Sequence, residues 1–300
     1  MLNDKLKNYL HLHFIVFIWG FTAVLGALIT IDAIPLVWFR MLLASFFVWL
    51  YVALNKFTLK VPKKAIITML IAGLVIALHW ITFFKAIKVS NVSVTLATIS
   101  TGAFFTAVLE PIFYKRKMIW YEIVFGLVVI AGLFIIFNVE TQYMLGIGLA
   151  LISALLSATF SLINGKLAKQ YRPSVISFYE LGSGVGFITL YLLFSGSFSA
   201  EFFKLSASDW MYLLLLASIC TAYAFIGSVK VMKLISPYTV MLTINMEPVY
   251  GIVLAFVILG ASEKMSHGFY IGAVIIIMTV VVNGILKNSL KRKRPIGQAK

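Results

Sequence analysis

The chain has 300 residues, of which 62% are hydrophobic and 12% charged, and its formal net charge is +15. Even a large soluble fold leaves roughly a quarter of its unfolded surface exposed, so this composition excludes a soluble globular protein and predicts a membrane protein. The single cysteine, Cys220, excludes an internal disulfide, and with four scattered histidines we expect no metal site and no other cofactor.

Apolar segments of membrane-spanning length recur along the chain. Each is close to the roughly 20 residues that a helix needs to cross the hydrocarbon core. We predict an all-α membrane protein with ten transmembrane helices, at 10–30, 35–54, 66–87, 91–114, 119–138, 143–165, 173–195, 209–229, 237–260 and 266–286. Short connections force neighbouring helices to run antiparallel. The first span follows two lysines, as a signal peptide does, but it lacks a clear cleavage site and we expect it to be retained.

The basic residues are distributed unevenly between the predicted connections. With a cytoplasmic amino terminus, 20 of the 25 Lys and Arg residues fall on the cytoplasmic side, four fall outside, and Arg40 lies inside a span. Cytoplasmic loops of membrane proteins carry such an excess of positive charge. We therefore predict both termini in the cytoplasm and a location in the plasma or inner membrane. The charge is then a topology signal, and we expect a lipid bilayer as partner and no nucleic acid.

The two halves of the chain resemble each other. Residues 88–105, "KVSNVSVTLATISTGAFF", align without a gap with residues 233–250, "KLISPYTVMLTINMEPVY". Because each half would contain an odd number of spans, the second half must enter the membrane upside down. Inverted repeats of this kind occur in many secondary transporters. We predict a first five-helix repeat at 1–138, an inverted second repeat at 143–286 and a basic cytoplasmic tail at 287–300.

Four segments carry a resemblance to a known family. "IWGFTAVLGALI" (18–29), "PLVWFRMLLAS" (35–45), "FKAIKVSNVSVTLATIST" (84–101) and "MEPVYGIVLAFVILGASEKMS" (246–266) resemble the EamA family of the drug/metabolite transporter superfamily. The resemblance implies five plus five helices, a central cavity lined by spans 1–4 and 6–9, and peripheral spans 5 and 10. It also implies transport of metabolites, including amino acids, often outward.

Glu247 is the most conspicuous polar residue inside a predicted span. A carboxylate in the middle of a bilayer is costly unless it is partnered, hydrated or protonated. The next residue, Pro248, has no N–H to offer the carbonyl of Ile244, so we expect a kink. Glu247 then either serves a transport site, which we favour, or is a hydrogen-bonded acid at a structural kink. The aligned position in the first half is Gly102, so the halves are not functionally equivalent.

Three further charged residues are candidates for a gate or for fixed ion pairs. Glu110 lies one turn before a basic cluster that includes Lys115, at the predicted cytoplasmic end of the fourth span. An interfacial carboxylate paired with this cluster and a cytoplasmic gate are the two alternatives. Glu180 lies within the seventh span, where we favour a fixed pair with a basic residue from a cytoplasmic helix end.

Other polar and aromatic residues within the spans are candidates for the cavity. Arg40 keeps its charge and needs an anionic partner or ligand, unless it snorkels outward. His79 either relays protons or is a neutral hydrogen-bonding group. The remaining candidates are Trp19, Trp38, Trp80, Thr98, Thr101, Asn164, Tyr179 and Asn245.

The leading functional hypothesis is a secondary transporter, favoured as an exporter, of a small metabolite such as an amino acid or a related compound. It would work by alternating access at a central cavity in the middle of the membrane. The sequence has no Walker A loop and no HExxH or GxSxG motif, which argues against ATP-driven transport and against an enzyme. Uniport and proton antiport, with Glu247 and His79 as the proton-handling candidates, are both open. The alternative is a non-transporting scaffold, sensor or partner subunit, and we also expect a homodimer through the peripheral helices.

Overall fold

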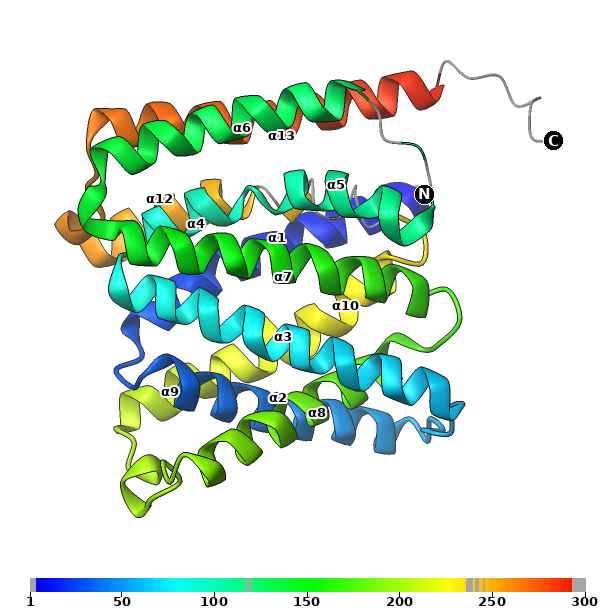
Figure 1. Ribbon diagram of the computed structural model, residues 1–300. Coiled ribbons are helices and arrows are strands. Elements are labelled where there is room, and N and C mark those ends of the chain that lie inside the picture. The colour runs from blue at the N-terminus through cyan, green and yellow to red at the C-terminus, as the bar shows by residue number, and fades with distance from the viewer. Residues whose placement is uncertain are drawn as a thin grey trace.

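Helices make up nearly all of the chain. The computed structural model describes residues 4–115, 117, 120–235, 240, 243–244 and 246–292, and no strand occurs among them. The helices lie side by side in one layered bundle (Figure 1). They are α1 (Asp4–Leu28), α2 (Ala33–Leu54), α3 (Lys63–Val89), α4 (Val92–Ile99), α5 (Gly102–Tyr114), α6 (Trp120–Val139), α7 (Met144–Leu167), α8 (Pro173–Phe194), α9 (Ala207–Ala217), α10 (Ala224–Val231), α12 (Glu247–Leu259) and α13 (His267–Arg292).

The helices have the length and composition of membrane spans. Seven segments of the described chain are long and apolar enough to cross a bilayer: Leu6–Leu28, Ala33–Leu54, Lys63–Val89, Val92–Tyr114, Thr141–Leu167, Pro173–Phe194 and Ala207–Val231. Shorter apolar helices occur at Val124–Val139 and His267–Thr279. The prediction of a multi-pass membrane protein is confirmed. The count of ten stays a prediction, because part of the ninth predicted span lies outside the described residues.

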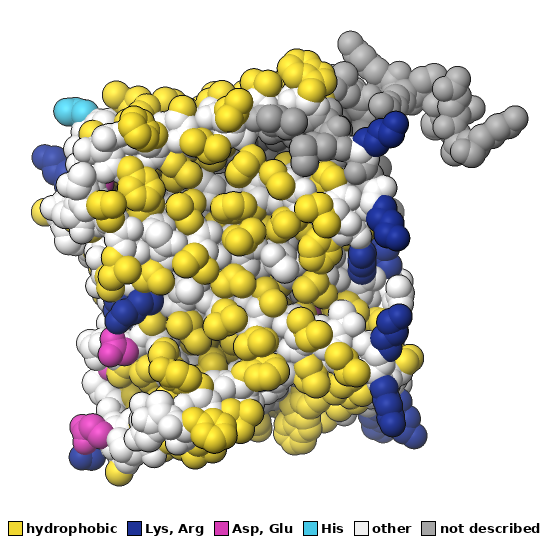
Figure 2. Space-filling view, viewed as in Figure 1, with side chains coloured by type: hydrophobic (Ala, Val, Ile, Leu, Met, Phe, Trp, Pro, Cys, Tyr) yellow, Lys and Arg dark blue, Asp and Glu magenta, His cyan; other side chains and the backbone are white. Residues whose placement is uncertain are grey.

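Side-chain chemistry divides the surface into an apolar band and a basic edge. Hydrophobic side chains cover the middle of the face in Figure 2, and Lys and Arg side chains line the edge on the right. Helix α1 begins and α13 ends at this same basic end (Figure 1). Acidic side chains appear at the opposite end of the molecule (Figure 2).

Helices α6 and α13 pack against each other along one edge of the bundle (Figure 1). They cross at two glycines, since a Cβ atom on Gly272 would lie 2.8 Å from the carbonyl oxygen of Gly132. Small residues let helices approach closely in a membrane. The opposite faces of both helices expose large apolar side chains, such as Phe134 and Val274. The pair therefore holds the peripheral position that the family resemblance implies for spans 5 and 10.

Helices α5 and α12 begin at equivalent positions of the two repeats. The first starts at Gly102 and the second at Glu247, the two residues that the gap-free alignment pairs, and each helix has 13 residues. In Figure 1 they run in opposite directions, as an inverted repeat requires. The expectation that Pro248 interrupts the hydrogen bonds of a continuous helix is wrong. Pro248 lies in the first turn of α12, where a missing N–H breaks no helical hydrogen bond.

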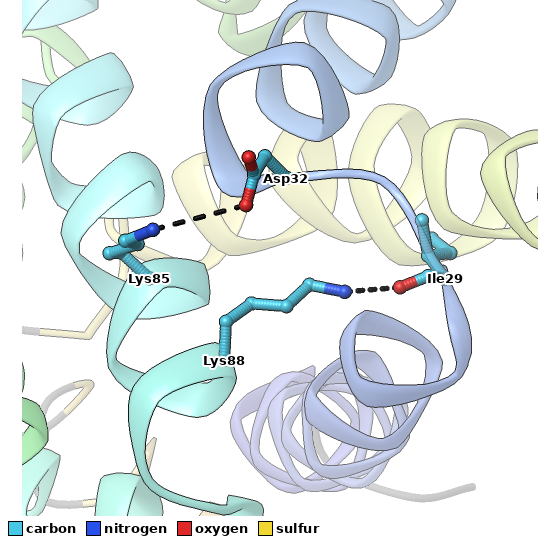
Figure 3. A network of polar contacts seen from close by, with 4 residues as sticks. All are labelled: Ile29, Asp32, Lys85 and Lys88. Atoms are coloured by element: carbon cyan, nitrogen blue, oxygen red, sulfur yellow. Dashed lines mark hydrogen bonds and ion pairs between the residues drawn. The ribbon is translucent and has the colours of Figure 1, made fainter. Parts of the chain in front are cut away.

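Polar contacts tie the helix ends together at the end of the molecule opposite the basic edge. The ammonium group of Lys88, in the last turn of α3, donates a hydrogen bond to the carbonyl oxygen of Ile29 after α1 (Figure 3). One turn earlier, Lys85 lies 3.8 Å from a carboxylate oxygen of Asp32, the residue before α2 (Figure 3). These contacts connect the α1–α2 turn to α3.

Two buried acids complete these connections. Asp209, near the start of α9, accepts hydrogen bonds from the backbone N–H and the hydroxyl of Thr30, both at 2.7 Å. Glu263 accepts hydrogen bonds from the backbone N–H groups of Val92 and Ser93, at 3.1 and 2.8 Å, and from the Ser93 hydroxyl, also at 2.8 Å. Both acids thereby satisfy backbone donors that lipid could not.

Candidate functional site

A small cavity of about 60 Å³ lies inside the bundle, with room for a few water molecules. Its wall combines residues of α1, α2, α3, α7, α10 and α12 with the breaks between helices. Five of the predicted candidates line it: Trp19, Arg40, His79, Trp80 and Glu247. The other lining residues are Thr22, Phe83, Ile99, Ser100, Ser157, Phe160, Cys220, Phe225, Ile244 and Pro248.

Arg40 is the dominant polar group of the cavity. Its side chain is only 2% exposed, and the guanidinium carbon lies 3.8 Å from the centre of the Trp80 ring, a cation–π contact. Its Nε donates a hydrogen bond of 2.7 Å to the hydroxyl of Thr221, whereas Nη1 is buried without a partner. Outward snorkelling is therefore wrong for Arg40. The free Nη1 is a donor that an anionic ligand would satisfy.

An irregular helix places the hydroxyl that holds Arg40. Residues Ser218–Tyr223, between α9 and α10, form a π-helical turn, and Thr221 there donates a hydrogen bond of 2.6 Å to the carbonyl oxygen of Leu216. The hydroxyl thus receives the Arg40 N–H while its own hydrogen is used within the helix. Single π-turns are frequent at functional sites.

Glu247 and His79 bring two more ionisable groups to the same cavity. Glu247 is the first residue of α12, where the positive end of the helix dipole favours a carboxylate. It lines the cavity with Arg40 without forming an ion pair to it. The Nδ1 atom of His79 lies 2.9 Å from the carbonyl oxygen of Ser153 and 2.8 Å from its hydroxyl oxygen, so Ser153 holds this nitrogen.

Several lining residues escaped the sequence analysis. Ser100 lies at the break between α4 and α5, at the position that the alignment pairs with Asn245. The internal repeat was therefore a usable signal for Ser100. Ser157, on α7, was not among the predicted candidates. Cys220 and Thr221 belong to the π-turn, which no sequence pattern indicated.

Two predicted aromatic candidates lie elsewhere. The Trp38 indole donates a hydrogen bond of 2.8 Å to the Thr189 hydroxyl, within a cluster of phenylalanine rings away from the cavity. The Tyr179 hydroxyl donates one of 2.9 Å to the carbonyl oxygen of Leu59. Neither side chain lines the cavity. Asn245 lies outside the described residues.

The two predicted threonines lie beside the cavity but do not line it. Both are buried, and the hydroxyl of Thr101 donates a hydrogen bond of 2.8 Å to the backbone carbonyl of Thr98. Among the gate candidates, Glu110 is half-buried near the end of α5. Lys115 ends that helix in the left-handed conformation, with φ of 51°, and is exposed. These two residues stay predictions.

Among the described residues, no basic side chain pairs with Glu180, contrary to expectation. It is buried on α8, and its Oε2 accepts a hydrogen bond of 3.2 Å from the amide of Asn164 on α7. Its burial inside the bundle keeps it from the exposed basic residues at the helix ends. Asn164 therefore belongs to this second polar pair and not to the cavity.

Comparison with known proteins agrees with this architecture. The sequence pattern of the EamA-like transporter family matches residues 7–138 and again residues 144–285. An uncharacterized transporter, YxxF, of Bacillus subtilis (strain 168) is 23% identical over 239 residues, which are 77% of this chain and 75% of that protein. A solved crystal structure superposes with a TM-score of 0.67 at 15% identity, covering 93% of this chain and 97% of the other. That structure supports the fold alone.

Proposed function

Because the chain belongs to the EamA-like transporter family, we propose that it is a secondary transporter that carries a small metabolite through the cavity lined by Arg40 and Glu247. The observation that carries this proposal is the unpaired Nη1 of Arg40, a buried cationic donor facing a cavity inside a membrane bundle. Intramembrane charges of this kind mark substrate pathways. A purely structural arginine would have all of its donors satisfied.

The chemistry of the cavity favours a small zwitterion. The guanidinium of Arg40 suits a carboxylate, and the carboxylate of Glu247 suits an ammonium group. The aromatic rings of Trp19, Trp80 and Phe83 would cover the apolar part of the ligand. An amino acid or a related compound combines these features.

Transport would proceed by alternating access between the two ends of the bundle, with export as the favoured direction. At the basic end, a recess of about 480 Å³ is lined by residues of α1 and α10, among them His11, Lys230 and Lys233. At the other end, Asp209 and Glu263 hold the helix termini together. If the basic end is cytoplasmic, as the positive-inside rule predicts, substrate would enter the cavity from the cytoplasm. This topology includes ten spans and both termini inside.

Substrate binding to purified protein tests the proposal. Screening amino acids, amines, nucleosides and sugars by thermal shift should give stabilisation by carboxylate-bearing compounds and not by their amides. Arg40→Lys should weaken that binding tenfold or more, because an ammonium group cannot replace the planar guanidinium. Arg172→Lys is the matched control, since Arg172 stacks on Phe57 outside the cavity.

Transport itself is measured with the same compounds in proteoliposomes. Flux that depends on the protein and falls in the Arg40→Lys variant would agree with the proposal. If no compound of any class binds or moves, the chain is better explained as a scaffold, sensor or partner subunit.

A further inference from the structure

A second polar pair lies inside the bundle, outside the central cavity. It consists of Glu180 on α8 and Asn164 on α7, and both side chains are 0% exposed. The Asn164 Nδ2 donates to Glu180 Oε2 at 3.2 Å. The other two oxygens of the pair, Glu180 Oε1 and Asn164 Oδ1, are buried without a hydrogen-bond partner. The pair therefore has two unsatisfied acceptors and lacks a donor.

No cation compensates a negative charge on Glu180 among the described residues. Helix α8 packs against α2, α3 and α10, and the Asn164 hydrogen bond reaches it from α7. Three basic side chains of these helices are bonded elsewhere: Arg40 of α2 to Thr221, Lys88 of α3 to Ile29 and Lys166 of α7 to Phe113. The others are exposed to solvent: Lys63, Lys64 and Lys85 of α3 and Lys230 of α10. The other titratable groups on these elements are His79, which binds Ser153, and the exposed Tyr51 and Tyr191 together with the half-buried Tyr179.

One proton added to Glu180 supplies the missing hydrogen-bond donor and neutralises the buried charge. A proton on Glu180 converts one carboxylate oxygen into a donor for an acceptor of the pair, and it removes the uncompensated buried charge. A metal cation fits this pair poorly, because ions such as Ca²⁺ and Mg²⁺ need about six oxygen ligands. The pair offers two unused side-chain oxygens, and none of the cavities described here is lined by them.

We propose that Glu180 and Asn164 form a proton-binding site, and that the proton held there is the coupling ion of the transporter. When the helices around this pair separate, the Glu180 O–H bond breaks and the proton passes to water that enters between them. When they close, Glu180 takes up a proton from water. The coupling part of this inference rests on the proposed transport function, whereas the binding of the proton does not.

The helices that carry this pair also carry the central cavity. Helix α7 supplies Asn164 to the pair and Ser157 to the cavity. Helix α3 touches Glu180 at Gly73, where an added Cβ would lie 2.2 Å from the Glu180 carbonyl oxygen, and it supplies His79 to the cavity. A movement that opens the cavity thus shifts the helices around Glu180, which is the mechanical basis of the coupling.

Infrared spectroscopy tests the proton directly. A protonated carboxyl has a C=O stretching band that a carboxylate lacks, and the full-length protein in nanodiscs at neutral pH should show one that disappears in Glu180→Gln. Glutamine can replace the proton, because its amide donates to Asn164 and its oxygen accepts from it, so the variant should fold. Glu201→Gln, at an exposed ion pair, is the control and should leave the band unchanged. Identical spectra for wild type and Glu180→Gln would overturn the site, and so would a wild-type spectrum without any such band.

Transport in proteoliposomes tests the coupling. A pH gradient should drive substrate accumulation by the wild type, and Glu180→Gln should lose this dependence at least tenfold while still exchanging substrate for substrate. Substrate accumulation that does not depend on the pH gradient, or that depends on a Na⁺ gradient instead, would overturn the proton coupling. Either result would leave the proposed transport function standing. If the infrared band is present but no substrate moves, the proposed function fails and the proton site stands.

Discussion

The replacement of Glu263 by alanine should destabilise the end of the bundle opposite the basic edge. Glu263 is 3% exposed and lies after α12, yet its carboxylate caps the first turn of α4, a helix more than a hundred residues earlier in the chain. It accepts the backbone N–H groups of Val92 and Ser93 and the hydroxyl of Ser93. Neither N–H has a helical acceptor, because the first turn of a helix leaves its donors unused.

The expected loss follows from these three hydrogen bonds. Hydrogen bonds to charged groups contribute about 1.5–3 kcal/mol each, and a buried donor left without a partner costs about 1–3 kcal/mol. The two values cannot be added, because the lost hydrogen bonds and the unpaired donors involve the same two N–H groups. The loss is also reduced because the alanine variant does not bury a carboxylate. We therefore expect Glu263→Ala to lower the free energy of unfolding by about 3 kcal/mol. Glu263→Gln should lose about half of that, since its single oxygen serves one donor and its NH₂ faces the other.

Unfolding in mixed micelles, followed by circular dichroism, measures these changes. Glu201→Ala is the control, because Glu201 forms an exposed ion pair with Lys204 and should contribute less than about 1 kcal/mol. Hydrogen exchange at Val92 and Ser93 should accelerate in Glu263→Ala and stay unchanged in Glu201→Ala. A loss under about 1 kcal/mol for Glu263→Ala, with exchange unchanged, would refute the role of Glu263 as a cap.

Three further predictions concern helix contacts and can be measured by the same unfolding assay. Gly73→Ala should destabilise the folded protein by about 1–3 kcal/mol, because the new methyl group meets a backbone carbonyl of α8. The control Gly148→Ala places its methyl group in open space and should be neutral or stabilising, and equal effects of the two changes would contradict this prediction. Asp209→Ala should cost about 2–4 kcal/mol, because it leaves the Thr30 donors unsatisfied, and a loss no larger than that of an exposed acid would contradict it. Lys85→Ala should change stability by less than about 0.5 kcal/mol, since its ion pair is 3.8 Å long and solvent-exposed; a larger loss would show that the pair is structural.

The fold was predictable to the extent that it depends on periodicity in the sequence. The absence of charge over long segments predicted the membrane helices, and the alignment of residues 88–105 with 233–250 predicted that α5 and α12 are related. The breaks before Gly102 and Glu247 were harder to predict, because only one of the two positions carries a proline. No sequence pattern indicated the π-turn at Ser218–Tyr223, whose Thr221 accepts the Arg40 hydrogen bond.

Residues of the cavity were predictable according to the cost of burying them. Arg40 and Glu247 were singled out because a charge inside a membrane needs a reason, and the structure brings both to one cavity. Side chains such as Thr101 and Tyr179 carry a weaker signal, because each can satisfy its hydroxyl on a nearby carbonyl in any apolar setting. Glu180 shows the limit of the rule. The cost of burying it was evident from the sequence, but its partner, Asn164, depended on how the fold brings a side chain of α7 to α8.

The two charges of the cavity also break the symmetry of the repeat. Arg40 comes from the first half. Glu247 comes from the second half, and the residue aligned with it in the first half is Gly102. A cavity with perfect two-fold symmetry would present the same groups to both ends of a ligand and could not orient it. In the transport that we propose, one half supplies the cation and the other the anion, so a zwitterion would have one preferred orientation. The related halves would then exchange their conformations around a ligand that need not turn over.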